Sequence, residues 1–178
     1  MDAASESFFL TIAQLALGFG GLAGLLGAFR KSSGPLQYQE IQGIKLILEH
    51  SVAAMVFSLL PVSLAFSSRL QGQGLKISSF LLALFLICDL INQGFRLRRG
   101  YSLGKPPRRP ISYAAFFATQ AILGCWLMYH TLSYTSLGWY ALALIWLLIP
   151  GALQLFTFVS VLTTTSTAQP PKIRGAKS

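Results

Sequence analysis

Hydrophobic residues are gathered into five long runs separated by short polar segments. The runs cover Phe8–Phe29, Ile44–Phe66, Ile77–Phe95, Ile111–Leu132 and Leu137–Leu162. A helix needs about 20 apolar residues to cross about 30 Å of hydrocarbon, and each run is close to that length. The pattern predicts an all-α, polytopic integral membrane protein with five transmembrane helices. We expect one transmembrane domain over residues 1–166 and a disordered, basic cytoplasmic tail over residues 167–178.

The composition supports a membrane protein over a soluble one. Of the 178 residues, 53% are hydrophobic and 11% are charged, whereas an ordinary soluble domain has about 25% charged residues. So few charges do not cover the surface of a water-soluble enzyme. The first apolar run follows Asp2 and Glu6 without a preceding basic residue, so it lacks the basic start of a signal peptide. We expect it to be a retained helix.

The distribution of basic residues predicts the orientation of the chain. With the N-terminus outside, twelve of the fourteen Lys and Arg residues lie on the inner side, and only Arg69 and Lys76 lie outside. The inner set is Arg30, Lys31, Lys45, Arg96, Arg98, Arg99, Lys105, Arg108, Arg109, Lys172, Arg174 and Lys177. Positive charge is retained on the cytoplasmic side of membrane proteins. The net charge of +9 therefore indicates a multi-pass protein of the inner (plasma) membrane with its C-terminus inside, and no nucleic-acid partner.

The segment between the third and fourth runs has the highest density of basic residues. We expect its arginines to contact anionic lipid headgroups of the inner leaflet. These are Arg96, Arg98, Arg99, Arg108 and Arg109.

Small residues recur along the first run at a spacing of three or four. They are Ala16, Gly20, Gly24, Gly27 and Ala28. Such a face lets the backbones of two membrane helices approach closely. Three arrangements fit it: packing against another helix of the same subunit, contact with a second copy of the chain, and the lining of a narrow pore.

Polar side chains lie within four of the runs, in the half of the membrane nearer the cytoplasm. They are Glu49, His50, Asp89, Asn92, Gln120 and Gln154. Each is costly in hydrocarbon unless it is paired. In a structural interpretation, Glu49 pairs with Lys45 one turn away, and Asp89 bonds to Asn92, Gln93 or a basic residue of a neighbouring helix. In a functional interpretation, the set lines a water-filled vestibule that opens to the cytoplasm.

Two prolines interrupt the runs, and no motif indicates catalysis. Pro61 and the pair Pro150–Gly151 lie inside the second and fifth runs, where proline removes a backbone hydrogen bond and creates a candidate hinge. The chain contains no metal-ligand spacing and no nucleophile motif. We therefore expect no catalytic residue, metal or cofactor.

These features favour a small homo-oligomeric channel or transporter-like protein for an ion or a small solute. Little chain lies outside the apolar runs, so the activity is expected within the bilayer. The alternative is a non-catalytic accessory or assembly subunit, which would join a larger membrane complex through the small-residue face.

Overall fold

A computed structural model describes residues 3–32, 38–66, 73–102, 110–133 and 136–166. These residues form five helices and no strand. The helices are α1 (Ala3–Ser32), α2 (Tyr38–Ala65), α3 (Gly74–Ser102), α4 (Pro110–Ser133) and α5 (Leu137–Ser166). The predicted all-α class is confirmed. The expected tail over residues 167–178 lies outside the described residues.

The helices extend beyond most of the apolar runs from which they were predicted. The third run ends at Phe95, but α3 continues through three arginines to Ser102. Arginine and leucine are good helix formers, so the backbone has no reason to leave the helix where the hydrocarbon would end. One consequence is that His50, Asp89 and Gln120 each lie near the middle of their helices.

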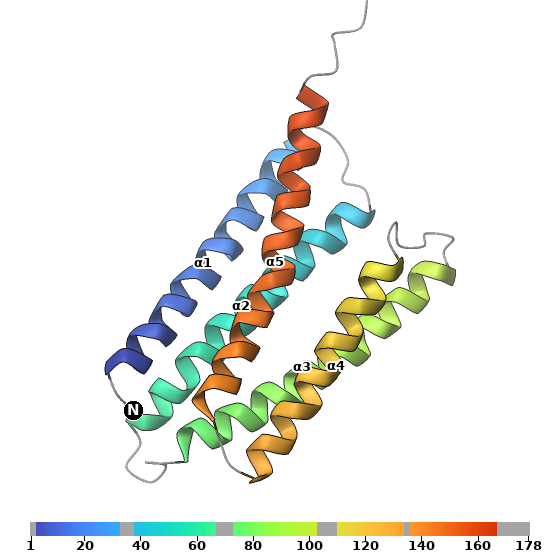
Figure 1. Ribbon diagram of the computed structural model, residues 1–178. Helices are drawn as coiled ribbons and strands as arrows, with labels where there is room; N and C mark the ends of the chain where they lie inside the picture. The colour runs from blue at the N-terminus through green and yellow to red at the C-terminus, as the bar shows by residue number, and fades with distance from the viewer. Residues whose placement is uncertain (1–2, 33–37, 67–72, 103–109, 134–135, 167–178) are drawn as a thin grey trace, which may run out of the picture.

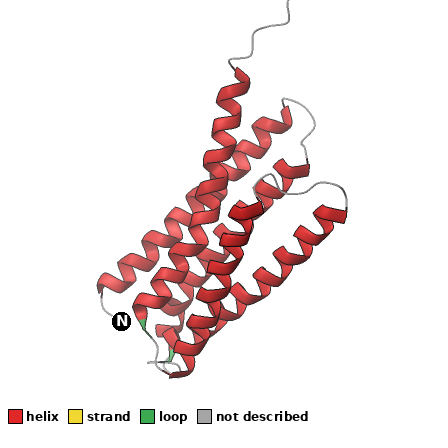
Figure 2. Cartoon of the chain, turned by 45° about the vertical axis from the view of Figure 1, so that its right-hand side comes forward, coloured by secondary structure: helices red, strands yellow, loops and turns green. Residues whose placement is uncertain are grey.

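Successive helices run in opposite directions, and α2 lies at the centre of the bundle (Figure 1). It packs against α1, α3 and α5, while α3 and α4 form a second closely packed pair. The helix axes are roughly parallel, as the turned view shows (Figure 2). The end of α3 and the start of α2 and α4 lie together at one end of the bundle (Figure 1). Helix α3 packs against α2 and against α4, so its central part can contact both.

Apolar side chains cover the outside of the bundle as well as its core. Exposed residues include Leu17, Phe95 and Ile122, of which Ile122 is 69% exposed, whereas His50 and Asp89 are buried. Segments Ala3–Phe29, Ile41–Ala65 and Gly74–Ser102 are long and apolar enough to cross a membrane. An apolar exterior around buried polar groups suits a lipid environment, so the fold is that of a membrane protein.

The core is built from large side chains that fit beside small ones. Phe9 of α1 meets Tyr140 of α5 edge-to-face, with ring centroids 5.7 Å apart. Leu82, Leu86 and Leu144 are fully buried. Alanines complete the core and keep the helices close together: Ala16, Ala53, Ala54, Ala83 and Ala143. Because lipid is as apolar as these side chains, close packing and hydrogen bonds hold the helices together.

A side chain of another helix supplies the hydrogen bond that the backbone of α2 lacks because of Pro61. Proline has no N–H, so the carbonyl of Phe57, one turn earlier, has no partner within α2. The hydroxyl of Tyr140 on α5 donates to this carbonyl. Both α2 and α5 continue as helices through their prolines, and Pro61, Pro150 and Gly151 are all buried.

Part of the small-residue face of α1 packs against α2. Ala16 is fully buried. A Cβ atom added at Gly20 would lie 3.6 Å from Cβ of Ser51, and one added at Gly27 would lie 3.5 Å from Cδ1 of Ile44. Because Gly20 and Gly27 have no side chains, α1 and α2 can approach closely at these two positions.

The rest of this face turns away from α2. Gly24 and Ala28 are exposed, and a Cβ atom at Gly24 would meet no described atom within 4 Å. A spacing of four residues exceeds one turn by about 40°, so a four-residue repeat winds around a helix of 3.6 residues per turn. Gly18 and Gly21 are open in the same way. Helix α1 therefore has a second small-residue surface on the outside of the bundle, formed by Gly18, Gly21, Gly24 and Ala28.

Candidate functional site

An ion pair joins α2 to α3 through Glu49 and Arg96. The two nitrogens of the guanidinium group each donate to one carboxylate oxygen at 2.8 Å. Such a two-point contact fixes direction as well as distance. The Lys45 ammonium lies 3.7 Å from the same carboxylate, as the spacing in the sequence predicted. Arg96 is the nearer partner of Glu49. Its contact with lipid headgroups stays a prediction.

His50 follows Glu49 in the chain and points to the other side of α2, between the helices. Its side chain is 2% exposed. Its Nδ1 atom lies 3.0 Å from the carbonyl oxygen of Leu46, one turn earlier. Its Nε2 atom lies 3.3 Å from Oδ2 of Asp89 on α3. The imidazole ring therefore bridges the backbone of its own helix and a carboxylate of the next.

Asp89 is the centre of the buried contacts. Its Oδ2 atom accepts hydrogen bonds from Nε2 of Gln93 at 2.5 Å and from Nε2 of Gln120 at 2.8 Å. The Gln120 amide also donates to the carbonyl of Leu86 at 3.2 Å. Asp89 is 8% exposed and Gln120 is 1% exposed, so the carboxylate is held almost entirely by protein groups.

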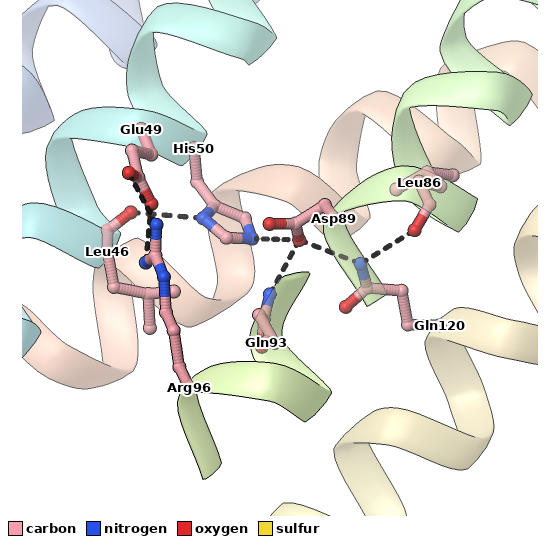
Figure 3. A network of polar contacts seen from close by, with 8 residues as sticks. All are labelled: Leu46, Glu49, His50, Leu86, Asp89, Gln93, Arg96 and Gln120. Atoms are coloured by element: carbon pink, nitrogen blue, oxygen red, sulfur yellow. Dashed lines mark hydrogen bonds and ion pairs between the residues drawn. The ribbon is translucent and has the colours of Figure 1, made fainter. Parts of the chain in front are cut away.

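These side chains form two neighbouring sets of polar contacts across three helices: Glu49 with Arg96, and Asp89 with His50, Gln93 and Gln120 (Figure 3). We call the two sets together the polar network. It comprises Glu49, His50, Asp89, Gln93, Arg96 and Gln120. Each of these side chains has at least one polar partner, which offsets part of the cost of removing it from water. The Oε1 atom of Gln120 is buried without a hydrogen-bond partner among the described residues.

A groove of about 740 Å³ lies beside the polar network. Its polar lining is Glu49, Asp89 and Asn92, and Cys88, which precedes Asp89 on α3, also lines it. Its remaining lining is apolar: Leu48, Val52, Ala53, Val56, Phe57 and Phe85. The groove follows the contact of α2 with α3, and gives Asp89 its route to the outside of the bundle.

The residues that the sequence assigned to a vestibule are thus divided by the structure. Glu49, Asp89 and Asn92 line the groove, while His50 and Gln120 lie buried behind it. Gln154 belongs to α5, but its side chain lies outside the described ones. Residues 108 and 109, predicted to contact lipid headgroups, also lie outside the described residues. Arg98 and Arg99 are exposed in the last turns of α3.

Sequence reasoning missed two contributors to the site. Gln93 appeared only as one possible partner of Asp89, and the pairing of Arg96 with Glu49 was not foreseen. Glu49 and Arg96 lie 47 residues apart in the chain, so no local spacing indicates their contact. The spacing of four between Asp89 and Gln93 is the one signal that was present.

The second histidine lies elsewhere. His130, in the last turn of α4, is buried among aromatic rings. Its ring stacks on Trp139 at 5.7 Å and lies 4.8 Å from the ring of Trp126. Among the residues that the structure describes, no three His, Cys, Asp or Glu side chains gather to hold a metal ion.

Comparisons with protein-family models, with curated proteins and with solved structures find no match to this chain. The polar network and the groove beside it are therefore the features that indicate a function.

Proposed function

We propose that this chain is a small homo-oligomeric channel or transporter-like protein of the plasma membrane. All five helices cross the bilayer in this proposal, with the N-terminus outside and the C-terminus inside. The shortest helix has 24 residues and the longest have 30, which correspond to about 36 and 45 Å. Both lengths exceed a hydrocarbon core of about 30 Å.

The polar network is the observation that carries this proposal. Asp89, His50, Gln93 and Gln120 come from three helices and are in contact near mid-length, and Arg96 pairs with Glu49 nearer the end of α3. Well-packed apolar residues would stabilise helix contacts as well as a buried ion pair does, or better. Ionisable residues placed within membrane helices are typical of pathways for ions, protons or solutes. The network is therefore better explained by transport than by stability.

The groove supports the same conclusion because it connects the network to the outside of the bundle. Three polar residues, Glu49, Asp89 and Asn92, face it. In the proposed orientation, the groove is the vestibule that opens toward the cytoplasm. A cation or a polar solute in it would meet two carboxylates.

Flux through the purified protein in liposomes tests the proposal. We expect wild-type protein to pass a monovalent cation or a small polar solute down its gradient. Asp89→Asn and Glu49→Gln should lower this flux by about tenfold, the factor that corresponds to about 1.4 kcal/mol in a barrier. Glu6→Gln is the matched control, since Glu6 lies in the first turn of α1 and away from the network. Equal flux in wild type and Asp89→Asn, or none in wild type, would contradict the proposal.

An accessory subunit remains the second candidate because of the outer surface of α1. This surface carries Gly18 and Gly21 together with the amide of Gln14, all exposed. Such a surface suits close contact with another membrane helix, either of a second copy or of a different protein. An accessory subunit would copurify with a larger complex and would give no flux alone. A discrete homo-oligomer with flux would favour transport.

A further inference from the structure

The carbonyl of Leu46 determines which nitrogen of His50 carries a proton. A carbonyl oxygen is only an acceptor, so Nδ1, at 3.0 Å, must donate to it. In a neutral ring with its proton on Nδ1, the Nε2 atom would present a bare lone pair. That lone pair would face Oδ2 of Asp89 at 3.3 Å, and two acceptors at this distance repel each other.

A second proton between His50 and Asp89 removes this conflict. It lies on Nε2, because Oδ2 of Asp89 already accepts amide N–H groups from Gln93 and Gln120. An oxygen that receives several donors is best satisfied as a charged carboxylate. The contact is thus that of an imidazolium–carboxylate ion pair: Nδ1 donates to the Leu46 carbonyl, and the charged ring faces Oδ2 of Asp89 at 3.3 Å (Figure 3).

The charged neighbours of the pair leave it one positive charge in excess. On α2 these are Lys45 and Glu49, and on α3 they are Arg96 and Asp89. Among the side chains that the structure describes, α4 and α5 bring no charged group, and α1 brings only Glu6, in its first turn. With His50 protonated, the charges of Lys45, Glu49, His50, Asp89 and Arg96 sum to +1. Loss of the His50 proton makes this group of five side chains neutral.

We propose that His50 and Asp89 form a proton-binding site, and that release of this proton loosens the contact between α2 and α3. The proton passes from Nε2 of His50 to the Asp89 carboxylate, which lines the groove, and from there to water in the groove. The ring becomes neutral, and Asp89 is again a carboxylate. The contact at 3.3 Å is then repulsive, and Asp89 is free to turn to the groove that it already lines. This inference rests on the proposed transport function. If the chain transports a solute, proton release from His50 couples that transport to protons.

Histidine ring-nitrogen NMR on the full-length protein in nanodiscs tests the site directly. The chain has two histidines, so ring ¹⁵N labelling gives two sets of signals, and His50→Gln identifies the set that belongs to His50. In wild type at pH 7 we expect both nitrogens of His50 to carry a proton. At pH 10 we expect a proton on Nδ1 alone. A bare Nε2 at pH 7 would overturn the proposal.

Asp89→Asn is the matched variant. The introduced amide still offers an oxygen to the glutamines and an N–H to Nε2, so the site stays hydrogen-bonded around a neutral ring. We expect His50 in this variant to lose its second proton at pH 7, while the signals of His130 stay unchanged. A His50 that remains doubly protonated without the carboxylate would contradict the role of Asp89.

The coupling is measured separately, as flux in liposomes with and without a pH difference. A pH difference should drive flux in wild type, and Asp89→Asn should lose this dependence. If His50 is doubly protonated but no flux occurs, the proposed transport function fails and the proton site stands. If flux occurs and His50 is neutral at pH 7, the transport function stands and the proton site fails.

Discussion

Tyr140 shows how a single side chain compensates for a backbone defect in another helix. Pro61 leaves the carbonyl of Phe57 without a helical donor, and the Tyr140 hydroxyl supplies one. Tyr140 is fully buried, so no water replaces it. The proline is thus held by α5 in this conformation, and a hinge at Pro61 would have to break this hydrogen bond.

Tyr140→Phe should lower the free energy of unfolding by about 1–2 kcal/mol, because a buried carbonyl loses its donor. Reversible unfolding in mixed micelles measures this value. In a Pro61→Ala background the backbone N–H returns, and the effect of Tyr140→Phe should shrink. Tyr129→Phe, at an exposed residue, is the control. An equal loss in both backgrounds would show that the hydroxyl serves another partner.

Glu49 and Arg96 should be energetically coupled. A double-mutant cycle with Glu49→Gln and Arg96→Gln is expected to give a coupling of about 1–3 kcal/mol, as for charged groups that share two short hydrogen bonds. The cycle of Glu49 with Lys45→Gln should give less than about 0.5 kcal/mol, since that pair is longer and Lys45 is exposed. Similar values for the two cycles would contradict the ranking of these partners.

At the scale of the helices, the sequence predicts the elements well and their faces poorly. The lengths of the apolar runs predicted all five helices, because an uninterrupted run of about 20 apolar residues is typical of a membrane-spanning helix. The contact of Glu49 with Arg96 and that of Asp89 with Gln120 escaped prediction. In a soluble helix the apolar side faces the core, but here both lipid and core are apolar, so the pattern does not show which side faces inward. The exposure of Gly24 and the burial of Ala16 illustrate this limit.

Two neighbouring glycines of α1 should respond differently to a large side chain. Gly20→Leu is expected to destabilise the fold by about 1–3 kcal/mol through overpacking, because a Cβ atom there lies 3.6 Å from Ser51. Gly21→Leu meets open space and should leave the monomer fold intact while it weakens association between copies. Thermal unfolding and the mass of the particle in detergent distinguish the two effects. If Gly21→Leu changed stability and not the mass, the outer surface of α1 would not be a contact between copies.

The whole molecule is an antiparallel bundle in which α2 connects the two parts. One part is α1 and α5, which both pack on α2, and the other is α3 and α4, of which α3 packs on α2; α5 also contacts α3 and α4. The polar network crosses the boundary between the parts at α2 and α3. A change in charge there acts on the contact of α2 with α3, which is one of the contacts between the two parts. The groove follows the same contact.

The rates at which a thiol reagent modifies the two native cysteines test whether this groove contains water. Cys88 lines the groove beside Asp89, whereas Cys125 is an exposed residue of α4 that does not line it. A thiol reacts as its thiolate, which forms in water and not in hydrocarbon. We predict that a charged, membrane-impermeant thiol reagent, added to the side that we propose to be cytoplasmic, modifies Cys88 at least about tenfold faster than Cys125. This ratio corresponds to about 1.4 kcal/mol in the barrier, and Cys88→Ser should remove the fast phase. Equally slow modification of both cysteines would show that lipid fills the groove, and would contradict a transport role for the polar network.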